Sequence, residues 1–102
     1  MKKLEIIIPH RRLNDASEIL KGANTGGMSH YKIEGRGKVK AEPVAIGRGT
    51  MQYIIIKDDQ VEELINKFIE KLGGDTLGGK IFVTDVQTAV DLSSKQRGES
   101  TI

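Results

Sequence analysis

Residues 59–74 read DQVEELINKFIEKLGG, and this stretch decides the fold. Its apolar residues recur at steps of three and one, so they form a single stripe along an amphipathic helix. The stripe consists of Val61, Leu64, Ile65, Phe68, Ile69 and Leu72. Asp59 and Glu62 are spaced as in a capping box at the start of the helix. Gly73 and Gly74 then end a helix that buries one face against the rest of the protein.

Working outward from this helix, the flanking segments show strand patterns and one more helical pattern. Short runs rich in β-branched residues indicate strands. These runs are 3–8, 28–34, 50–56 and 80–86. In residues 13–21 the apolar side chains return at helical spacing. We expect Asn14 or Asp15 to cap this helix and Gly22 to end it.

The order strand–helix–strand–strand–helix–strand is that of a ferredoxin-like α+β domain, βαββαβ. We expect one domain over residues 1–102, with an antiparallel sheet and both helices on one face. The other face would carry Leu4, Ile6 or Ile7 and part of the run Ile54–Ile56. Because an uncovered apolar face needs a partner, we expect a homo-oligomer that covers it.

Two loops and a tail complete the chain. Residues 35–49 are rich in glycine and basic residues, and residues 73–80 read GGDTLGGK between the second helix and the last strand. A glycine-rich loop that ends in lysine suits either a flexible turn or a phosphate site, because glycine N–H groups and a lysine charge both bind phosphate. Residues 87–102 are polar and predict a loosely held tail, in which 87–92 fits one turn of helix.

Composition excludes several classes of function. The chain has 102 residues, of which 37% are hydrophobic and 29% charged, with no cysteine and two histidines. A disulfide scaffold, Cys-ligated zinc and thiol catalysis are therefore excluded, and we expect no metal. Capping explains the carboxylate pair Asp58-Asp59, and no other catalytic constellation is present, so we expect no enzyme. Without a long apolar run or a signal-peptide pattern, we expect a cytoplasmic protein.

Charge is distributed unevenly along the chain, although the net charge is only +2. Residues 1–51 hold ten Lys and Arg against five Asp and Glu, and residues 52–102 hold six against nine. The cations of the segment 31–48 are Lys32, Arg36, Lys38, Lys40 and Arg48. This segment suits either a solvated loop or an anion-binding loop. The small net charge argues against a nucleic-acid coat or a polybasic membrane anchor.

The fold alone does not decide the function, because unrelated activities share it. An RNA-binding module with this topology would stack bases on aromatic side chains of the sheet. The candidates are Tyr31, Tyr53 and Phe82, but no basic–aromatic motif surrounds them. An RNA-binding module therefore stays an alternative, and we expect no nucleic-acid partner.

Short segments along the whole chain carry a family pattern. They are the opening MKKLEIIIPHRRLNDASEIL, Thr25–Ser29, Gly35–Gly37, Asp58–Val61, Gly79–Val83 followed by Asp85 and Val86, and Arg97–Glu99. From residue 1 to about residue 99 the sequence resembles the PII signal-transduction proteins. The segments Asp58–Val61 and Gly79–Val83 at this separation are specific, whereas the G-x-G of Gly35–Gly37 is weak by itself.

This resemblance implies a homotrimer that has no catalysis of its own and binds an adenine nucleotide in the clefts between subunits. The implied contacts are Gly27, Met28 and Ser29 near the adenine, Gly35, Arg36, Gly37 and Lys38 at the edge of the cleft, and Gly78, Gly79 and Lys80 in the phosphate-binding B-loop, residues 73–80. The segment 35–50 corresponds to the mobile T-loop of the family. Through residues 36–49 it would regulate a membrane transporter or an enzyme of nitrogen or inorganic-carbon metabolism.

Departures from the family pattern change the expected ligand. The T-loop is shortened and lacks, between Gly37 and Thr50, the tyrosine that some relatives modify. Val39 stands where the family has the glutamine that helps to hold Mg²⁺ and 2-oxoglutarate, and Gly78 stands where an acidic residue is usual. These changes argue against sensing of 2-oxoglutarate.

The tail departs from the family as well. The two arginines that bind phosphate after the last strand are replaced by Asp91 and Ser93, and Lys95 and Arg97 are the nearest substitutes if the tail folds back. Because all these losses weaken binding of the outer phosphates, we expect ADP or AMP to be favoured over ATP–Mg²⁺.

Two further alternatives rest on resemblance. A divergent PII-like branch is associated with carboxysomes, and some of its members respond to ADP, AMP or bicarbonate. The basic segment from Arg36 to Arg48 would supply an anion site in a protein of that kind. A CutA-like trimer that binds a divalent metal is disfavoured, because histidine is scarce and cysteine is absent.

Overall fold

Four strands and two helices form the folded body of the protein, which we describe from a computed structural model covering residues 1–23, 27–35, 47–74 and 78–102. The strands are β1 (Lys2–Pro9), β2 (Ser29–Gly35), β3 (Gly47–Ile56) and β4 (Lys80–Asp85). The helices are α1 (Leu13–Lys21) and α2 (Val61–Leu72). Short 3₁₀ turns are η1 (His10–Arg12), η2 (Asp58–Gln60) and η3 (Glu99–Thr101).

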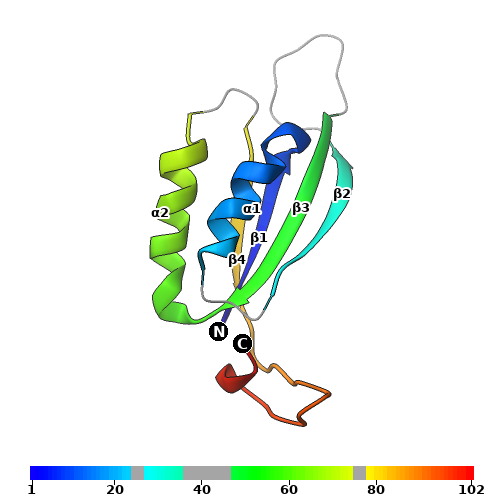
Figure 1. Cartoon of the computed structure of the whole chain (residues 1–102), viewed down its shortest axis with the longest axis vertical. Coiled ribbons are helices and arrows are strands. Elements are labelled where there is room, and N and C mark those ends of the chain that lie inside the picture. The colour runs from blue at the N-terminus through cyan, green and yellow to red at the C-terminus, as the bar shows by residue number, and fades with distance from the viewer. Residues whose placement is uncertain (24–26, 36–46, 75–77) are drawn as a thin grey trace.

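All neighbouring strands are antiparallel, in the order β2-β3-β1-β4, and both helices pack on one face of the sheet (Figure 1). This arrangement confirms the predicted ferredoxin-like α+β fold. β2 ends, and β3 and β4 begin, at the end of the sheet opposite the two chain termini (Figure 1). We call the end with Gly35, Gly47 and Lys80 the loop end, and the end with Lys2 and Asp85 the terminal end.

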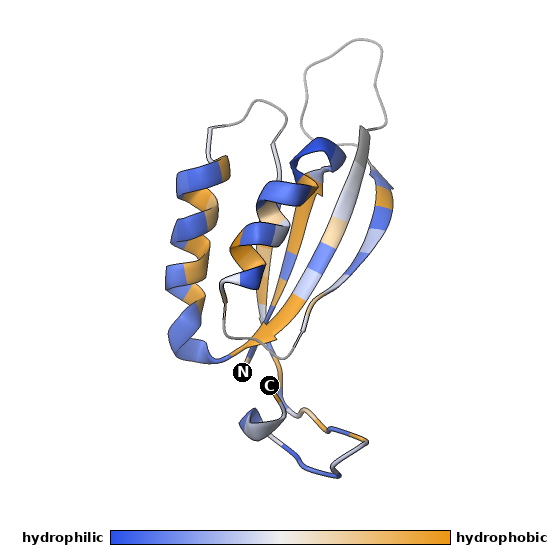
Figure 2. Ribbon diagram, in the orientation of Figure 1, coloured by the Kyte–Doolittle hydropathy of each residue, from blue (hydrophilic) through white to orange (hydrophobic). Residues whose placement is uncertain are grey.

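The core lies between the helices and the covered face of the sheet. Leu4, Ile6 and Ile8 alternate inward along β1, because successive side chains of a strand point to opposite faces. They pack in one cluster with buried residues of β3 and both helices, namely Ala16, Leu20, Ile54, Ile56, Val61, Leu64 and Phe68. Figure 2 shows the hydrophobic side of α2 turned toward α1 and the sheet. The predicted apolar stripe therefore faces the core, except for Ile69, which is exposed.

The prediction for the open face of the sheet is correct in part. Leu4, expected on this face, is fully buried under the helices and pairs with Ile54. Ile7, one of the two predicted alternatives, and Ile55, from the predicted run Ile54–Ile56, do lie on the open face, since they alternate with buried residues. The prediction for Leu4 was wrong because a run of consecutive isoleucines does not show where the two-residue alternation starts.

Strand β3 begins at Gly47, three residues before the predicted start at Thr50. Gly49 pairs with both Ile33 and Pro9, and an added Cβ there would lie 2.8 Å from the Ile8 carbonyl oxygen. The glycine thus lets β3 approach β1 closely inside a segment that reads as loop. The rest of the predicted T-loop, residues 36–46, lies outside the described residues.

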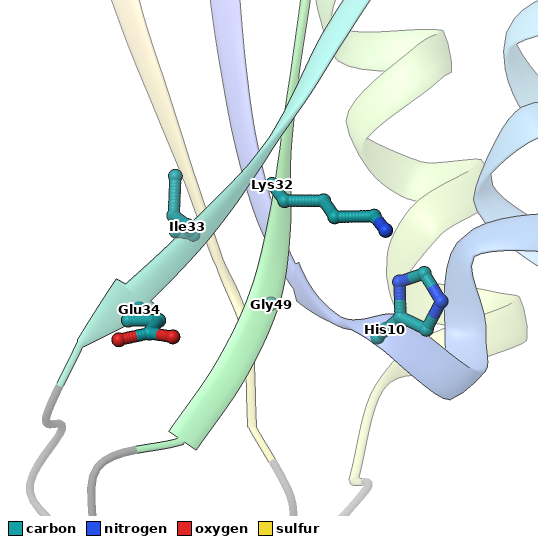
Figure 3. A pocket seen from close by; sticks show the side chains of 5 residues that line it. All are labelled: His10, Lys32, Ile33, Glu34 and Gly49. Atoms are coloured by element: carbon teal, nitrogen blue, oxygen red, sulfur yellow. The ribbon is translucent and has the colours of Figure 1, made fainter.

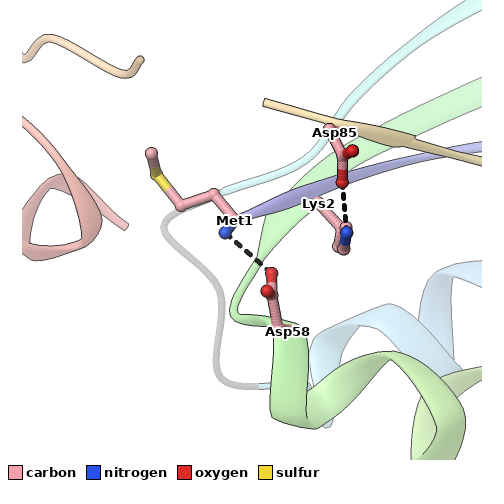
Figure 4. Close-up of polar contacts among 4 residues, drawn as sticks. All are labelled: Met1, Lys2, Asp58 and Asp85. Carbon is pink, nitrogen blue, oxygen red and sulfur yellow. Dashed lines mark hydrogen bonds and ion pairs between the residues drawn. The ribbon is translucent and has the colours of Figure 1, made fainter. Parts of the chain in front are cut away.

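Neither helix has the side-chain cap that we predicted. Both are entered through a 3₁₀ turn, and Arg12 and Gln60, which precede them, make no side-chain cap hydrogen bond. Asp58 instead accepts a hydrogen bond from the N-terminal ammonium group of Met1 at 2.7 Å (Figure 4). Capping does not account for the Asp58-Asp59 pair.

The helix ends agree better with the sequence. Gly73 and Gly74 follow α2, as predicted; an added Cβ at Gly73 would lie 2.3 Å from the Ile69 carbonyl oxygen, and Gly74 has φ +80°. Gly22 ends α1 but has φ −75°, so it does not adopt the left-handed conformation of a glycine C-cap. No described helix has the length and apolarity to cross a membrane.

The tail beyond β4 forms a small closed loop near the terminal end (Figure 1). Val90 and Arg97 form an antiparallel bridge, and the Asp91 carboxylate accepts hydrogen bonds from the Ser93 and Ser94 amides. The predicted helical turn at 87–92 is therefore wrong, because Asp91 organises a turn through its own side chain.

Candidate functional site

The start of β4 presents the predicted phosphate-binding residues at an edge of the sheet. Gly78 and Gly79 have φ values of +78° and +138°, and an added Cβ at Gly79 would lie 2.9 Å from the Ile7 carbonyl oxygen. Both glycines are therefore required by the backbone itself. Lys80 follows them, is exposed and pairs in register with Ile7, so it belongs to the open face. Lys80 takes part in none of the ion pairs found among the described residues.

The residues predicted near the adenine lie at the start of β2, on the opposite edge of the sheet. Gly27 has φ +149°. Met28 is about one third exposed, and its Sδ accepts a hydrogen bond from Gln52 Nε2 at 3.4 Å, on the helix-covered side. Ser29 pairs with Tyr53 and so belongs to the open face.

Two strands, β3 and β1, separate these groups within one chain. At a spacing of about 4.8 Å between strands, the two edges lie roughly 14 Å apart. Gly35 is at the loop end of β2, also across the sheet from Lys80. The structure therefore does not bring Gly27–Ser29, Gly35 and Gly78–Lys80 together in a single chain. Arg36, Gly37 and Lys38 lie outside the described residues.

Lys95 and Arg97 are on the tail, near the terminal end, whereas Lys80 begins β4 at the loop end (Figure 1). Both side chains are exposed. Lys95 has φ 63° and its N–H donates to the Asp91 carbonyl oxygen at 2.8 Å, which closes the turn. The tail does not fold back toward Lys80 of the same chain.

The open face combines apolar and charged residues. Tyr31, Tyr53 and Phe82 share this face, and Tyr31 and Phe82 are about half exposed. The Lys3 ammonium group lies 5.0 Å from the centre of the Tyr53 ring and 3.1 Å from the Glu5 carboxylate. A cation over an aromatic ring and a neighbouring ion pair hold this surface in one arrangement.

A separate hollow of about 500 Å³ opens beside β2, near the loop end. It is lined by His10, Lys32, Ile33, Glu34 and Gly49. Figure 3 shows the Lys32 side chain extending toward the imidazole of His10, while the Glu34 carboxylate lies away from both. His10 Nδ1 is 3.4 Å from Thr50 Oγ1.

The resolved electrostatic effects concern the terminal end. The pKa of Asp58 is lowered, first because its carboxylate accepts a hydrogen bond from the N-terminal ammonium group. The pKa of Lys2 is raised, first because its amine donates to the Asp85 carboxylate (Figure 4). These pairs fix the start of β1 against η2 and β4, at the opposite end of the sheet from Lys80. Among the described residues no group of three or more His, Asp or Glu side chains is placed to hold a metal ion.

Comparison with known proteins reveals the family of this chain. Residues 1–96 match the family model described as nitrogen regulatory protein P-II. The chain is 27% identical to the nitrogen regulatory protein P-II of Cereibacter sphaeroides and 29% identical to that of Pasteurella multocida (strain Pm70), over the full length of both chains. It is 30% identical to that of Pyropia yezoensis, over 88% of this chain and 89% of the relative. The chain belongs to the PII family.

PII proteins are regulatory signalling proteins without enzymatic activity, and this chain is a signalling protein of that nitrogen regulatory family. Proteins of the PII family are trimers, bind adenine nucleotide effectors and interact with transporters or enzymes. The separation of the predicted contacts across one PII chain is thus consistent with a ligand held between chains.

Sequence analysis missed two buried polar residues in strand β3 of this PII protein. Thr50 and Gln52 are the buried polar residues of the described core, at 1% and 0% exposure. Gln52 Nε2 donates to Ser17 Oγ at 3.1 Å, while Gln52 Oε1 is buried with no hydrogen-bond partner among the described residues. The available signal was two polar residues at alternate positions in a strand that is otherwise apolar, which places both on one face.

Proposed function

We propose that the protein is a non-catalytic PII-like trimer that binds ADP or AMP between subunits, in preference to ATP–Mg²⁺. Binding would change the pose of the loop 36–49 and thereby its contact with a membrane transporter or an enzyme of nitrogen or inorganic-carbon metabolism. Membership of the PII family supports the nucleotide, the trimer and the kind of partner.

The single observation that carries the proposal is the start of β4. Two glycines with positive φ precede an exposed lysine that has no carboxylate partner among the described residues. Backbone N–H groups and an ammonium group at an open sheet edge can bind phosphate oxygens. The β2 edge of a second copy would supply Met28 and Ser29, which one chain leaves on the far side of its own sheet.

Titration calorimetry of the full chain with AMP, ADP, ATP and ATP–Mg²⁺ tests this function. We expect ADP or AMP to bind with micromolar affinity, about −8 kcal/mol. Lys80→Gln removes the charge and keeps much of the side-chain length, so ADP affinity should fall about tenfold or more, because a charged phosphate contact is lost. Light scattering should report a trimer for both proteins.

The matched control is Lys57→Gln, at an exposed lysine beside η2 near the other end of the sheet. It should leave nucleotide affinity unchanged. Equal affinities of the Lys80→Gln variant and the unaltered protein would refute the phosphate contact, and a monomer that binds no adenine nucleotide would refute the proposed function as a whole.

A specific observation also favours testing the alternative of an RNA-binding module. Tyr31, Tyr53 and Phe82 share the open face, where aromatic residues of this topology could stack bases. A trimer that buries this face excludes that use. Fluorescence anisotropy with single-stranded RNA decides between them, since RNA binding requires an affinity that falls steeply with salt.

The bicarbonate-responsive alternative rests on the basic segment 36–48, most of which lies outside the described residues. Calorimetry with bicarbonate, with and without ADP, tests it. The absence of heat in both titrations would remove this alternative and leave the nucleotide proposal standing.

A further inference from the structure

We propose that the hollow beside β2 is a second ligand site, which binds a small oxyanion, either a carboxylate or a phosphate, between Lys32 and His10. Lys32 comes from β2 and His10 from η1, so two separate elements direct nitrogen-bearing side chains into one space (Figure 3). A volume of about 500 Å³ is in the range of small-molecule sites.

The charge at Lys32 is available to a ligand. Lys32 is exposed and takes part in none of the ion pairs found among the described residues. Among the described residues that line the hollow, Glu34 carries the carboxylate, and it lies away from the Lys32 ammonium group (Figure 3). An anion near Lys32 and His10 would therefore gain a charged hydrogen bond without displacing an internal partner.

His10, which lines the hollow, has a buried polar neighbour in Thr50. Thr50 is directly opposite Lys32 in the β2–β3 register, is 1% exposed, and its hydroxyl lies 3.4 Å from His10 Nδ1. Placing a buried hydroxyl in the core requires a hydrogen-bond partner, and His10 is the partner that the structure supplies. This contact holds the imidazole at the hollow.

Gly49 lines the hollow at a place where β3 approaches β1 closely. It lines the space without a side chain, and an added Cβ would lie 2.8 Å from the Ile8 carbonyl oxygen. The close approach of β3 to β1 thus excludes larger residues at this position.

The lysines of the two proposed sites lie on opposite faces of the sheet. Lys32 and Thr50 belong to the helix-covered side of the sheet, whereas Ser29 and Lys80 belong to the open side. The two proposals therefore stand or fall separately.

The test is a titration of the ¹⁵N-labelled full chain with sodium phosphate and, separately, with sodium acetate at constant ionic strength, followed by NMR. We expect saturable shifts of the Gly49 amide and the His10 ring signals, with a Kd of about 1–10 mM. A stronger response to phosphate indicates a phosphate-bearing ligand, and a stronger response to acetate indicates a carboxylate. The absence of saturation with both ions would overturn the proposal.

Lys32→Gln should lower the affinity for the anion about tenfold, whereas Lys32→Arg should retain it. The pair of variants distinguishes loss of charge from a folding defect. Lys21→Gln, at an exposed lysine that ends α1, is the matched control and should change nothing. Equal weakening by the Lys21→Gln and Lys32→Gln variants would mean an adventitious ion only and would overturn the site.

The same titration of the Lys80→Gln variant tests whether the two proposed sites are different. Lys80→Gln should leave the shifts of the Gly49 and His10 signals with phosphate unchanged, even though it lowers the affinity for ADP. If Lys80→Gln abolishes both responses, the anion occupies the nucleotide site and the second site does not exist. If Lys32→Gln alone abolishes the phosphate response, the second site holds even where ADP does not bind at all.

Discussion

The two halves of β3 on the helix-covered face are equally buried but chemically different. Toward the terminal end, Ile54 and Ile56 are each 1% exposed and join the core cluster. Toward the loop end, Thr50 and Gln52 are 1% and 0% exposed, yet they carry a hydroxyl and an amide. Burial alone thus does not predict chemistry along this strand.

The difference follows from what lies over each half. The apolar half packs with α2 residues such as Leu64 and Phe68. The polar half adjoins β2, whose helix-side residues His30, Lys32 and Glu34 are exposed and are not covered by a helix in Figure 1. We infer that the apolar half supplies stability, whereas the polar half holds Gln52 to Ser17 of α1 and Thr50 beside His10, which lines the hollow.

The largest expected effect is in the apolar half. Leu64→Ala should lower the free energy of unfolding by about 2–5 kcal/mol, because Leu64 is 3% exposed and its removal leaves a cavity. Ile69, on the same helix, is 61% exposed, so Ile69→Ala should lower the free energy of unfolding by only about 0.5 kcal/mol. Urea denaturation at one protein concentration measures both, and equal losses would contradict the assignment of the core.

The polar half should respond less to loss of its polar group. Gln52→Leu removes two hydrogen bonds from Nε2 but also removes the buried, unpaired Oε1, so the free energy of unfolding should change by no more than about 1 kcal/mol. Gln52→Ala also removes packing and should cost more, by the cavity term. A loss for Gln52→Leu as large as that for Leu64→Ala would show that the amide is a main source of stability.

The smallest effect is expected at the terminal end, where Asp58 pairs with the N-terminal ammonium group of Met1. Hydrogen bonding to the N-terminal ammonium group lowers the pKa of Asp58 below its usual 3.8. Its contribution to stability is therefore present above about pH 3.8 and is lost as the pH falls through the lower folded pKa. Asp58→Asn should remove part of the acid dependence of the melting temperature.

Asp59→Asn is the control for this pH dependence, because Asp59 makes no ion pair with a described residue. Melting curves between pH 2 and 7 measure the dependence for each protein. Identical curves for Asp58→Asn and the unaltered protein would show that the ion pair with Met1 contributes nothing in solution.

The regular elements were largely predictable from the sequence. Helix α1 spans the predicted residues 13–21, and α2 ends at the predicted Gly73. Both follow from local spacing, because an amphipathic stripe and a following glycine are properties of a short stretch of chain.

Predictions that depended on neighbouring elements were less accurate. Asp59 could not be recognised as a residue of a 3₁₀ turn, since that turn forms where β3 enters α2. The strand from Gly47 reads as loop because its glycines are explained only by the approach of β1. One turn of helix was predicted at 87–92 because Asp91 was not recognised as the residue that closes a turn.

The candidate site, too, was predictable only where it depends on a local sequence pattern. Gly78, Gly79 and Lys80 were found from sequence because a glycine pair before a lysine is a local pattern. That these residues and Ser29 lie on opposite edges of one sheet follows only from the strand order. His10 and Lys32 are 22 positions apart in the sequence and meet only through the register of β1, β2 and β3.

The amino-acid sequence by itself determined the kinds of element, their order and the family pattern, since these reside in residue spacing along the chain. The tertiary structure alone decided that Leu4 faces the helices, that Thr50 and Gln52 are buried, and that a hollow opens beside Lys32. The physical reason is that facing, burial and edge position depend on which strand lies beside which, and pairing between residues distant in sequence sets that order.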